Sequence, residues 1–366
     1  MKLHKTILVA PLNWGLGHAT RSIPIIYALI AEGFEVILAS DGMALTLLQK
    51  EFPQLESIEL PSYKIEYAKK AKRFKWKMLL RSPKVLKAIR QEREQLKSLV
   101  KTKKIDGVIS DNRLGLYHTE IPTVFITHQL QVLSGSTTRL TSAMHRNYIK
   151  KFDECWVPDF AEESNLSGKL GHPKKFEIPV KYIGALSRLE PVETTSSYDI
   201  MVLLSGPEPQ RTELEELLMH ELKHYKGQVL FVRGVVEEEQ TVTRKEQVKI
   251  VNFMETEDLQ KALCASDLII CRSGYTTVMD LYKLKKKAFF IPTPGQTEQE
   301  YLAKRLHNLG IIPYKDQEKF SLKDLSKVKV YSGFTSSFDQ VRFNQGSFRE
   351  LFGLFKGERK LRSHSK

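Results

Sequence analysis

The sequence is poor in cysteine and has no long apolar run. Its three cysteines, Cys155, Cys264 and Cys271, form no CxxC pair, which argues against a disulfide framework or a zinc site and favours a reducing, cytoplasmic compartment. No stretch of about 18 uninterrupted apolar residues occurs, so no helix is expected to span a membrane. The apolar run at 6–11 is short and soon followed by polar residues and glycines, so we do not expect a signal peptide.

Acidic side chains are scarce in one segment. The chain of 366 residues carries 57 Lys and Arg against 43 Asp and Glu, a net charge of +14. Residues 69–104 contain 15 of the basic side chains and only two acidic ones, Glu92 and Glu94. Phe74 and Trp76 lie among the lysines, and basic side chains with an aromatic belt fit an anionic membrane surface. A solvated helical face is the simpler interpretation, and nucleic acid is disfavoured because no recognised binding motif is present.

The first 42 residues follow the order strand, loop, helix, strand. Residues 6–11 form an apolar run, residues 13–18 form a glycine-containing turn, and residues 19–31 have helical periodicity. A second apolar run at 34–39 ends at Ser-Asp-Gly. This order predicts the opening of a doubly wound α/β domain.

The same order recurs in the second half of the chain. Residues 200–204 predict a strand, 205–210 a turn and 212–225 a helix. The hydrophobic content of 41% supports sizeable cores, and the length suits two domains. We therefore expect an N-terminal Rossmann-like domain over 1–182, a C-terminal Rossmann-like domain over 183–333, and a helical tail over 334–366 that packs back on the first domain.

Residues 271–280 are the most informative block. An apolar strand runs into Arg-Ser-Gly-Tyr-Thr-Thr, where a helical pattern begins. Backbone N–H groups and hydroxyls at a helix N-terminus suit a phosphate, and Asp280, one turn further, can accept hydrogen bonds from sugar hydroxyls. The proline-bracketed loop at 291–300 adds the polar side chains Gln296, Glu298 and Gln299. Together they predict a site for a nucleotide diphosphate sugar.

Polar residues also follow other predicted strands, where ligands lie in open α/β sheets. His18 ends the first glycine-rich turn, and its ordinary pKa of about 6.5 suits a general base; a phosphate contact and a structural role are alternatives. Asp111 is a second candidate base, and Arg113 a candidate phosphate clamp. A dinucleotide fingerprint is disfavoured because Thr20 stands at its third glycine position.

Residues 271–280 and 291–300 resemble the donor-site motif of family 28 glycosyltransferases. In that family an Arg-Ser-Gly turn precedes a Thr and an acidic residue, and a proline-rich loop with a Gln follows. Two departures are visible: the family acid is usually Glu where Asp280 stands here, and the Gln-Gln pair of close family members appears as Gln299-Glu300. Gly17-His18 matches a family loop that ends in Gly-His.

The resemblance implies a GT-B fold, in which two Rossmann-like domains with doubly wound parallel sheets face each other across a cleft. It implies an inverting transfer of a hexosamine or hexose from a UDP-sugar to a hydroxyl acceptor, including a lipid-linked one. Uracil is expected near Phe253-Met254 and the ribose at Asp280. The residues expected to bind the donor are Gly15, Gly17, Ser205, Gly206, Phe253, Met254, Arg272, Ser273, Gly274, Thr276, Thr277, Asp280, Gln296, Glu298 and Gln299. Those expected to act in catalysis are His18 and Asp111, and those expected to bind the acceptor are Asn112, Arg113 and His128.

Two alternatives remain at this stage. A UDP-sugar hydrolase of the same superfamily also carries a Gly-His near an Arg, as in Gly17-His18 and Arg21. A non-catalytic protein that binds membrane or nucleic acid through 69–104 is the second. We expect no metal and no cofactor, because the histidines are scattered and lack partner carboxylates at ligand spacing. The expected location is the cytoplasm, at the inner face of the cell membrane.

Overall fold

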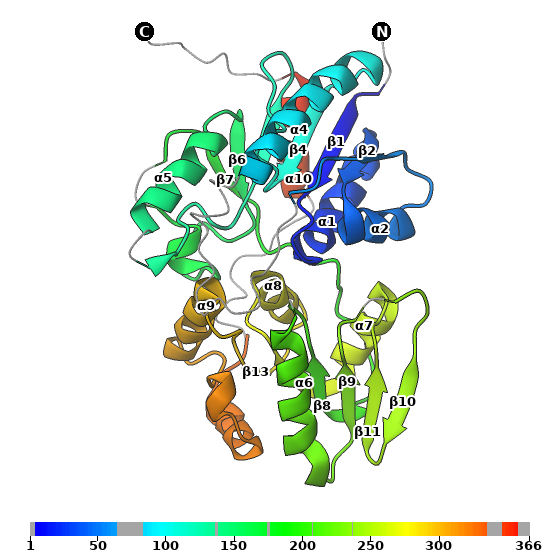
Figure 1. The fold of residues 1–366 in the computed structure, drawn as a ribbon, viewed down its shortest axis with the longest axis vertical. Coiled ribbons are helices and arrows are strands. Elements are labelled where there is room, and N and C mark those ends of the chain that lie inside the picture. Colours follow the sequence, from blue (N-terminus) through cyan, green and yellow to red (C-terminus); the bar gives the residue numbers. More distant parts are fainter. Residues whose placement is uncertain are drawn as a thin grey trace.

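A computed structural model describes residues 4–63, 83–135, 138–173, 176–206, 208–235, 237–334 and 346–357. The aromatic residues Phe74 and Trp76 and much of the basic segment 69–104 therefore lie outside the described residues, as do 335–345 and 358–366. Two α/β domains are stacked along the long axis of the molecule (Figure 1). Within the described part of the chain, no helix combines the length and apolar character needed to cross a membrane.

The N-terminal domain is built on a seven-stranded sheet in the order β3-β2-β1-β4-β5-β6-β7. Every strand pair is parallel. The strands are β1 (Thr6–Pro11), β2 (Glu35–Ser40), β3 (Ser57–Glu59), β4 (Gly107–Asp111), β5 (Thr123–Ile126), β6 (Glu154–Val157) and β7 (Val180–Tyr182). Their helices are α1 (Gly17–Ala31), α2 (Gly42–Glu51), α4 (Pro83–Thr102) and α5 (Thr138–Ile149). All six residues of β1 are buried, as expected for a parallel strand that is covered on both faces.

The C-terminal domain is built on a six-stranded sheet in the order β10-β11-β9-β8-β12-β13. Its strands are β8 (Tyr198–Leu203), β9 (Val229–Val232), β10 (Val242–Lys245), β11 (Val248–Val251), β12 (Ser266–Cys271) and β13 (Ala288–Phe290). Its main helices are α6 (Gln210–Glu221), α7 (Thr256–Cys264), α8 (Tyr275–Lys283) and α9 (Thr297–Asn308), and it contains 3-10 turns at Leu222–His224, Gln317–Lys319 and Leu322–Val330. A further 3-10 turn, Gly168–Leu170, lies between β6 and β7 of the N-terminal domain. The edge strand β10 runs antiparallel to β11, which departs from the all-parallel sheet that the sequence predicted.

The two domains share buried contacts rather than only facing each other. One continuous apolar cluster includes Ile23 and Leu166 from the first domain and Val278 and Leu302 from the second. Residues 183–197 link β7 to β8. The predicted two-domain α/β fold is confirmed, and the sequence pattern does not predict the short strands β3, β7, β10 and β13, because they carry too little periodicity.

Two short helices near the end of the described chain, α10 (Gly346–Leu351) and α11 (Gly353–Lys356), lie against the first domain. The ring of Phe352 packs edge-on against Phe34, with centroids 5.7 Å apart. Lys5 Nζ donates to the Phe355 carbonyl oxygen at 2.5 Å. The chain thus crosses from the first domain to the second and returns to the first (Figure 1).

Candidate functional site

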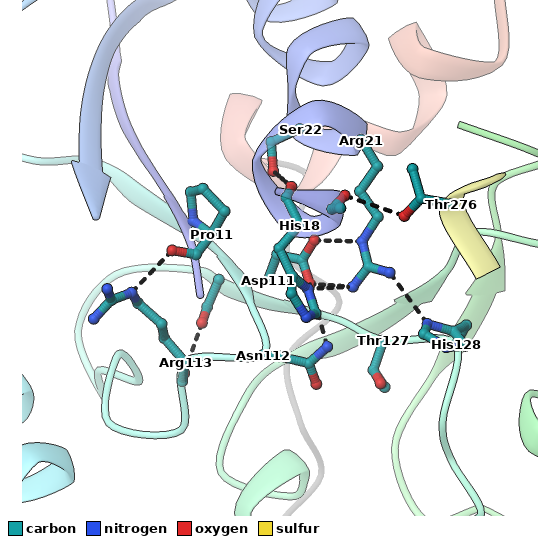
Figure 2. Close-up of polar contacts among 12 residues, drawn as sticks. Pro11, His18, Arg21, Ser22, Asp111, Asn112, Arg113, Thr127, His128 and Thr276 are labelled. Carbon is teal, nitrogen blue, oxygen red and sulfur yellow. Dashed lines mark hydrogen bonds and ion pairs between the residues drawn. The ribbon is translucent and has the colours of Figure 1, made fainter. Parts of the chain in front are cut away.

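The candidate site lies where the carboxyl ends of the parallel strands of the two sheets meet. Gly17, at the start of α1, and Thr276, in the first turn of α8, touch across this boundary: the Thr276 hydroxyl donates to the Gly17 carbonyl oxygen at 3.3 Å. Figure 2 shows Thr276 beside Arg21, with His18 and Asp111 close by. Ligands of open α/β sheets bind at such strand ends, so the position alone marks a candidate cleft.

His18 and Asp111 form the central pair of the site. Asp111 is the last residue of β4, and its Oδ1 lies 2.9 Å from His18 Nδ1. Burial of the ring, together with the charge of Arg21, lowers the pKa of His18 below its ordinary value, although Asp111 acts in the opposite direction. With its Nδ1 proton directed to Asp111, a neutral His18 keeps a free lone pair on Nε2, which is the form that a general base requires.

Arg21 joins both members of this pair. Its Nε donates to Asp111 Oδ2 at 2.5 Å, and its Nη2 donates to Asp111 Oδ1. Nη2 also lies 2.7 Å from His18 Nδ1, a contact that is no hydrogen bond while the Nδ1 proton is directed to Asp111, because both groups are then donors. Burial alone would raise the pKa of Asp111, but the charge of Arg21 and the contacts to His18 lower it to about 2. Asp111 is therefore ionised throughout the neutral range, and its two oxygens are held by a planar fork (Figure 2).

His128, after β5, extends the cluster toward the second domain. Arg21 Nη1 lies 3.1 Å from His128 Nδ1; because a guanidinium can only donate, Nδ1 is the acceptor and the ring proton sits on Nε2. Nε2 then donates to Glu298 Oε1 at 2.8 Å, and Gln129 Nε2 donates to Glu298 Oε2. The sequence predicted that Glu298 meets the donor sugar, whereas here its carboxylate contacts the other domain.

The N-terminus of α8 faces the glycine loop of the first domain. Gly274 precedes the helix with extended backbone angles, φ −68° and ψ 144°, and Thr276 and Thr277 are partly exposed. Gly15 is exposed and has a φ of 70°, with nothing within 4 Å of the place where a Cβ would stand. Free helix N–H groups, two hydroxyls and an approachable backbone are the parts of an anion site.

Asp280 lies one turn into α8, next to the linker. Ser187 Oγ donates to Asp280 Oδ1 at 2.6 Å. Burial raises the pKa of Asp280 to about 6, against the opposing effects of Ser187 and Arg188. Arg188 is half-buried beside Asp280 and Glu51; burial lowers its pKa, and the negative charges of these two carboxylates oppose that shift. Sequence reasoning missed Ser187 and Arg188, because nothing in their local pattern marks a site; only the path of the linker brings them here.

Two residues of the donor motif are turned inward. Arg272 is fully buried and donates from Nη1 to the carbonyl oxygens of Ile291 and Pro292, at 3.0 and 3.2 Å. Its Nη2 donates to the Gln210 carbonyl oxygen at 2.7 Å. Ser273 Oγ donates to the Gln299 carbonyl oxygen at 2.8 Å, also with no exposed surface. The expectation that these two side chains bind the donor is therefore corrected: they fix the loops around it.

Arg113 needs the same correction. The sequence predicted a phosphate clamp at the acceptor site, but the side chain is completely buried. It forms ion pairs with Asp41 and with Glu92, the latter at 2.7 Å. Two residues beyond Asp111, it points away from the His18 cluster toward Pro11 (Figure 2). Asn112 stays in the cluster and donates to Asp111 Oδ1 at 3.3 Å.

The proline-bracketed loop is organised by its own amides. Gln299 Oε1 accepts from the Thr293 N–H at 2.9 Å, and its Nε2 donates to Gln296 Oε1 at 2.8 Å. These bonds fix both amides, so a hydrogen bond to a sugar has to use the donors and acceptors of Gln296 and Gln299 that are still unpaired in these bonds.

Ser205 and Gly206 are exposed at the end of β8. Beside them Glu208 accepts from the Thr212 N–H at 3.2 Å, so its carboxylate already occupies the N-terminus of α6. A phosphate is therefore better placed at α8 than at α6, because like charges repel.

Phe253 and Met254 lie in the turn after β11 and are partly exposed. The buried Asn252 accepts from the Phe253 N–H at 2.9 Å and from the Thr241 N–H at 2.8 Å. This double contact fixes the backbone of the turn, and Gln240 Nε2 also donates to the Phe253 carbonyl oxygen at 2.9 Å. Across the described residues, no cluster of three His, Cys, Asp or Glu side chains is arranged to hold a metal ion.

Two solved glycosyltransferases have the same arrangement. The fold matches the glycosyltransferase SnogD from Streptomyces nogalater with a TM-score of 0.63 and 13% identity, over 96% of this chain and 100% of that one. It matches the glycotransferase of kitacinnamycin with a TM-score of 0.61 and 14% identity, over 97% and 95% of the two chains. The architecture is thus GT-B, with two Rossmann-like domains facing each other.

Comparison of the sequence with protein families finds a match in the second domain. Residues 211–332 match the family model described as the glycosyltransferase family 28 C-terminal domain. The matched residues include 271–280 and 291–300, so the resemblance of these two segments to family 28 glycosyltransferases is confirmed.

Two relatives carry the same printed name, UDP-N-acetylglucosamine--N-acetylmuramyl-(pentapeptide) pyrophosphoryl-undecaprenol N-acetylglucosamine transferase. The protein of Haemophilus influenzae (strain PittGG) is 25% identical over 230 residues, which cover 59% of this chain and 61% of that protein. The protein of Caldicellulosiruptor saccharolyticus is 24% identical over 302 residues, 76% of this chain and 78% of that one.

Proposed function

We propose that this protein is an inverting glycosyltransferase that moves a hexosamine or hexose from a UDP-sugar to a hydroxyl group. The observation that carries the proposal is the placement of His18. Its ring is paired with Asp111 through Nδ1, and it stands in the first turn of α1, whose Gly17 touches Thr276 at the N-terminus of α8. A base on one domain therefore faces a phosphate-binding helix end on the other.

The reaction is a single displacement. As the acceptor oxygen attacks the anomeric carbon, its proton passes to His18 Nε2. The bond between that carbon and the diphosphate oxygen breaks, and UDP leaves with the electron pair. The negative charge that develops on UDP is stabilised by the N–H groups of α8 and the hydroxyls of Thr276 and Thr277, an electrostatic effect that is often the largest in catalysis. Attack opposite the leaving group inverts the configuration at the sugar.

The nucleoside is proposed to lie along the linker side of α8. Asp280 accepts hydrogen bonds from the ribose hydroxyls, with Arg188 and Ser187 fixing its carboxylate. The fixed turn at Phe253 and Met254 meets uracil through its backbone. Gln296 and Gln299 border the sugar.

For the acceptor we propose a lipid-linked hydroxyl at an anionic membrane surface, on the cytoplasmic side. The names of the relatives include undecaprenol. Helix α4 supports the proposal, because it buries Val85, Ile89 and Leu96 while lysines such as Lys84 and Lys97 face solvent. Such basic side chains contribute about 1 kcal/mol each near an anionic surface.

The first experiment is calorimetric titration with UDP and with UDP-N-acetylglucosamine, on the wild type and on Asp280→Ala. Micromolar binding that the substitution abolishes supports the donor site. Absence of nucleotide binding to the wild type would contradict the proposal and favour a binding protein that acts through 69–104.

Hydrolysis of the donor is the second candidate, and the contact of Arg21 with His18 favours it enough to test. Product analysis with and without an undecaprenol-linked acceptor separates the two activities. Free sugar formed at the same rate in both reactions would identify a hydrolase, whereas a glycosylated lipid identifies a transferase.

A further inference from the structure

Tyr275 belongs to the donor motif, yet its side chain leaves the donor site and enters the first domain. The ring is 3% exposed. It stacks on the His128 imidazole with ring centroids 4.2 Å apart and planes 10° apart. Its hydroxyl donates to the Pro158 carbonyl oxygen at 2.7 Å. Because Tyr275 is the first residue of α8, the helix that faces the Gly17 loop is fastened to the first domain by this ring.

A second residue of the C-terminal domain contacts the same imidazole. Glu298, in the first turn of α9, accepts from His128 Nε2 at 2.8 Å. The face and the edge of the His128 ring are thus both held from the second domain. The remaining ring nitrogen, Nδ1, accepts from Arg21.

We propose that Tyr275 is a positioning residue for sugar transfer: by holding His128, it keeps the Arg21 guanidinium aligned with Asp111 and His18. The inference rests on the proposed function. Tyr275 acts through His128 and Arg21, and it touches neither substrate. It also joins the donor helix α8 to the base, so the reactive arrangement is complete only while the two domains are in contact.

The physical reason lies in how Arg21 is fixed. Its fork is bonded to Asp111 on one side and to His128 on the other. Without a fixed imidazole the guanidinium loses one of its two supports and can turn about the Asp111 bonds. The stacked ring also excludes water from the cluster, and an offset or stacked aromatic pair contributes energy beyond its buried area.

The consequence falls on the titration of His18. The charged and titratable groups that face this ring are Asp111 from β4, Arg21 from α1, His128 after β5 and Glu298 from α9. Burial and the Arg21 charge both lower the pKa of His18. Loss of the Tyr275 stack admits water and releases Arg21, so both lowering effects weaken and the pKa of His18 rises.

The test is an NMR titration of isotope-labelled histidine in the full-length chain, with the His18 resonance assigned from a His18→Gln variant. In Tyr275→Leu, which keeps the site apolar but removes the ring, we expect the His18 midpoint to move up by about one pH unit. Tyr275→Phe keeps the stack and should stay close to the wild type. Glu298→Ala removes the second support of His128 from a partly exposed helix, and it can be measured even if Tyr275→Leu does not fold. The lost negative charge by itself lowers the pKa of His18, so the midpoint should move in the same direction but by less than in Tyr275→Leu.

Tyr282→Leu is the matched control. Tyr282 lies on the same helix and packs on Phe160 of the first domain, with centroids 5.1 Å apart, whereas the ring stacked on His128 is that of Tyr275. An equal midpoint shift in Tyr282→Leu, or no shift in both Tyr275→Leu and Glu298→Ala, would overturn the proposal.

The kinetic readout is separate. We expect kcat of Tyr275→Leu to fall about tenfold, with the Kd for UDP within about twofold of the wild type. If the wild type fails to bind UDP, the proposed function fails, while the titration still decides whether Tyr275 positions the cluster.

Discussion

A Cβ atom on Gly17 would lie 2.7 Å from the hydroxyl oxygen of Thr276, so the two domains approach each other here as closely as glycine permits. Gly17→Ala should therefore hold the domains apart. A displacement of about 1 Å in a reacting group can cost about 100-fold in rate, and we expect a loss of kcat of that order. Steady-state kinetics measure the loss, and small-angle scattering should show an expanded molecule.

The partner of that contact provides the control. In Gly17→Ala/Thr276→Ala the clashing hydroxyl is gone, and the next atom, the Thr276 Cβ, lies at 3.4 Å. The double variant should recover the activity of Thr276→Ala alone. If it stays as inactive as Gly17→Ala, steric separation of the domains is not the cause.

His18 should be essential while its removal leaves the fold intact. Loss of a general base typically costs about 10²- to 10⁴-fold in rate, so His18→Ala should lose turnover in that range with an unchanged circular dichroism spectrum. Because burial and Arg21 lower the pKa of His18, the acidic limb of the kcat/KM profile, on which activity rises as His18 loses its proton, should lie below the ordinary value of 6.5. Near-normal turnover of His18→Ala would remove the catalytic role.

Asp111 should make the fold sensitive to acid. Its pKa is lowered from 3.8 to about 2 in the folded chain, so its contribution to stability is fully present above pH 4 to 5 and is lost as the pH falls toward 2. That contribution is about 2 kcal/mol. Denaturant unfolding at several pH values should show it as a difference between the wild type and Asp111→Asn that shrinks on acidification.

A second effect applies to Asp111→Asn at neutral pH. The variant leaves the buried Arg21 without its counter-ion, a change that typically costs about 3 to 5 kcal/mol. Glu216→Gln, on the exposed face of α6, removes one acid without this consequence and should unfold like the wild type. Equal stability of the two variants at pH 7 would contradict the assignment of the Arg21 fork.

Asp280 should behave in the opposite way. In the folded chain the pKa of Asp280 is about 6, above the ordinary 3.8, so the folded chain binds the proton more tightly than the unfolded chain does. Protonated Asp280 therefore stabilises the fold at low pH, and this stabilisation is lost as the pH rises through 6. At pH 8 the ionised carboxylate costs about 3 kcal/mol. Asp280→Asn, which can still accept from Ser187, should raise the melting temperature by a few degrees and weaken UDP binding. A lower melting temperature would show that the carboxylate stabilises the fold.

The positions of the site residues in the fold could be predicted from the sequence, because the carboxyl ends of parallel strands lie at one edge of each sheet. Residues 6–11 and 267–271 are apolar runs that stop at glycine-containing turns, and these turns hold His18 and Thr276. Asp111 and His128 follow two neighbouring strands for the same reason. Local pattern is sufficient for such positions because strand and helix ends are set by nearby residues.

The direction of a side chain could not be predicted in the same way. Arg272 turns inward because carbonyl oxygens from the later loop at Ile291 and Pro292 receive it, and a strand-to-turn pattern contains no information about that loop. Tyr275 was left without a role, although its burial against Pro158 depends on how the domains pack. Ser187 and Arg188 reach Asp280 through the path of the linker, which is a tertiary property.

The return of α10 and α11 to the first domain has a consequence for synthesis on the ribosome. A Cβ on Gly107 of β4 would lie 2.4 Å from the Phe355 ring. The Phe355 side chain therefore covers part of a sheet whose first strand is translated about 350 residues earlier. During translation, the apolar surface of the first domain that Phe355 covers stays exposed until the whole second domain has emerged from the ribosome. Chaperones that bind exposed apolar surface should therefore engage the nascent chain late in translation, and release should coincide with docking of the returning helices.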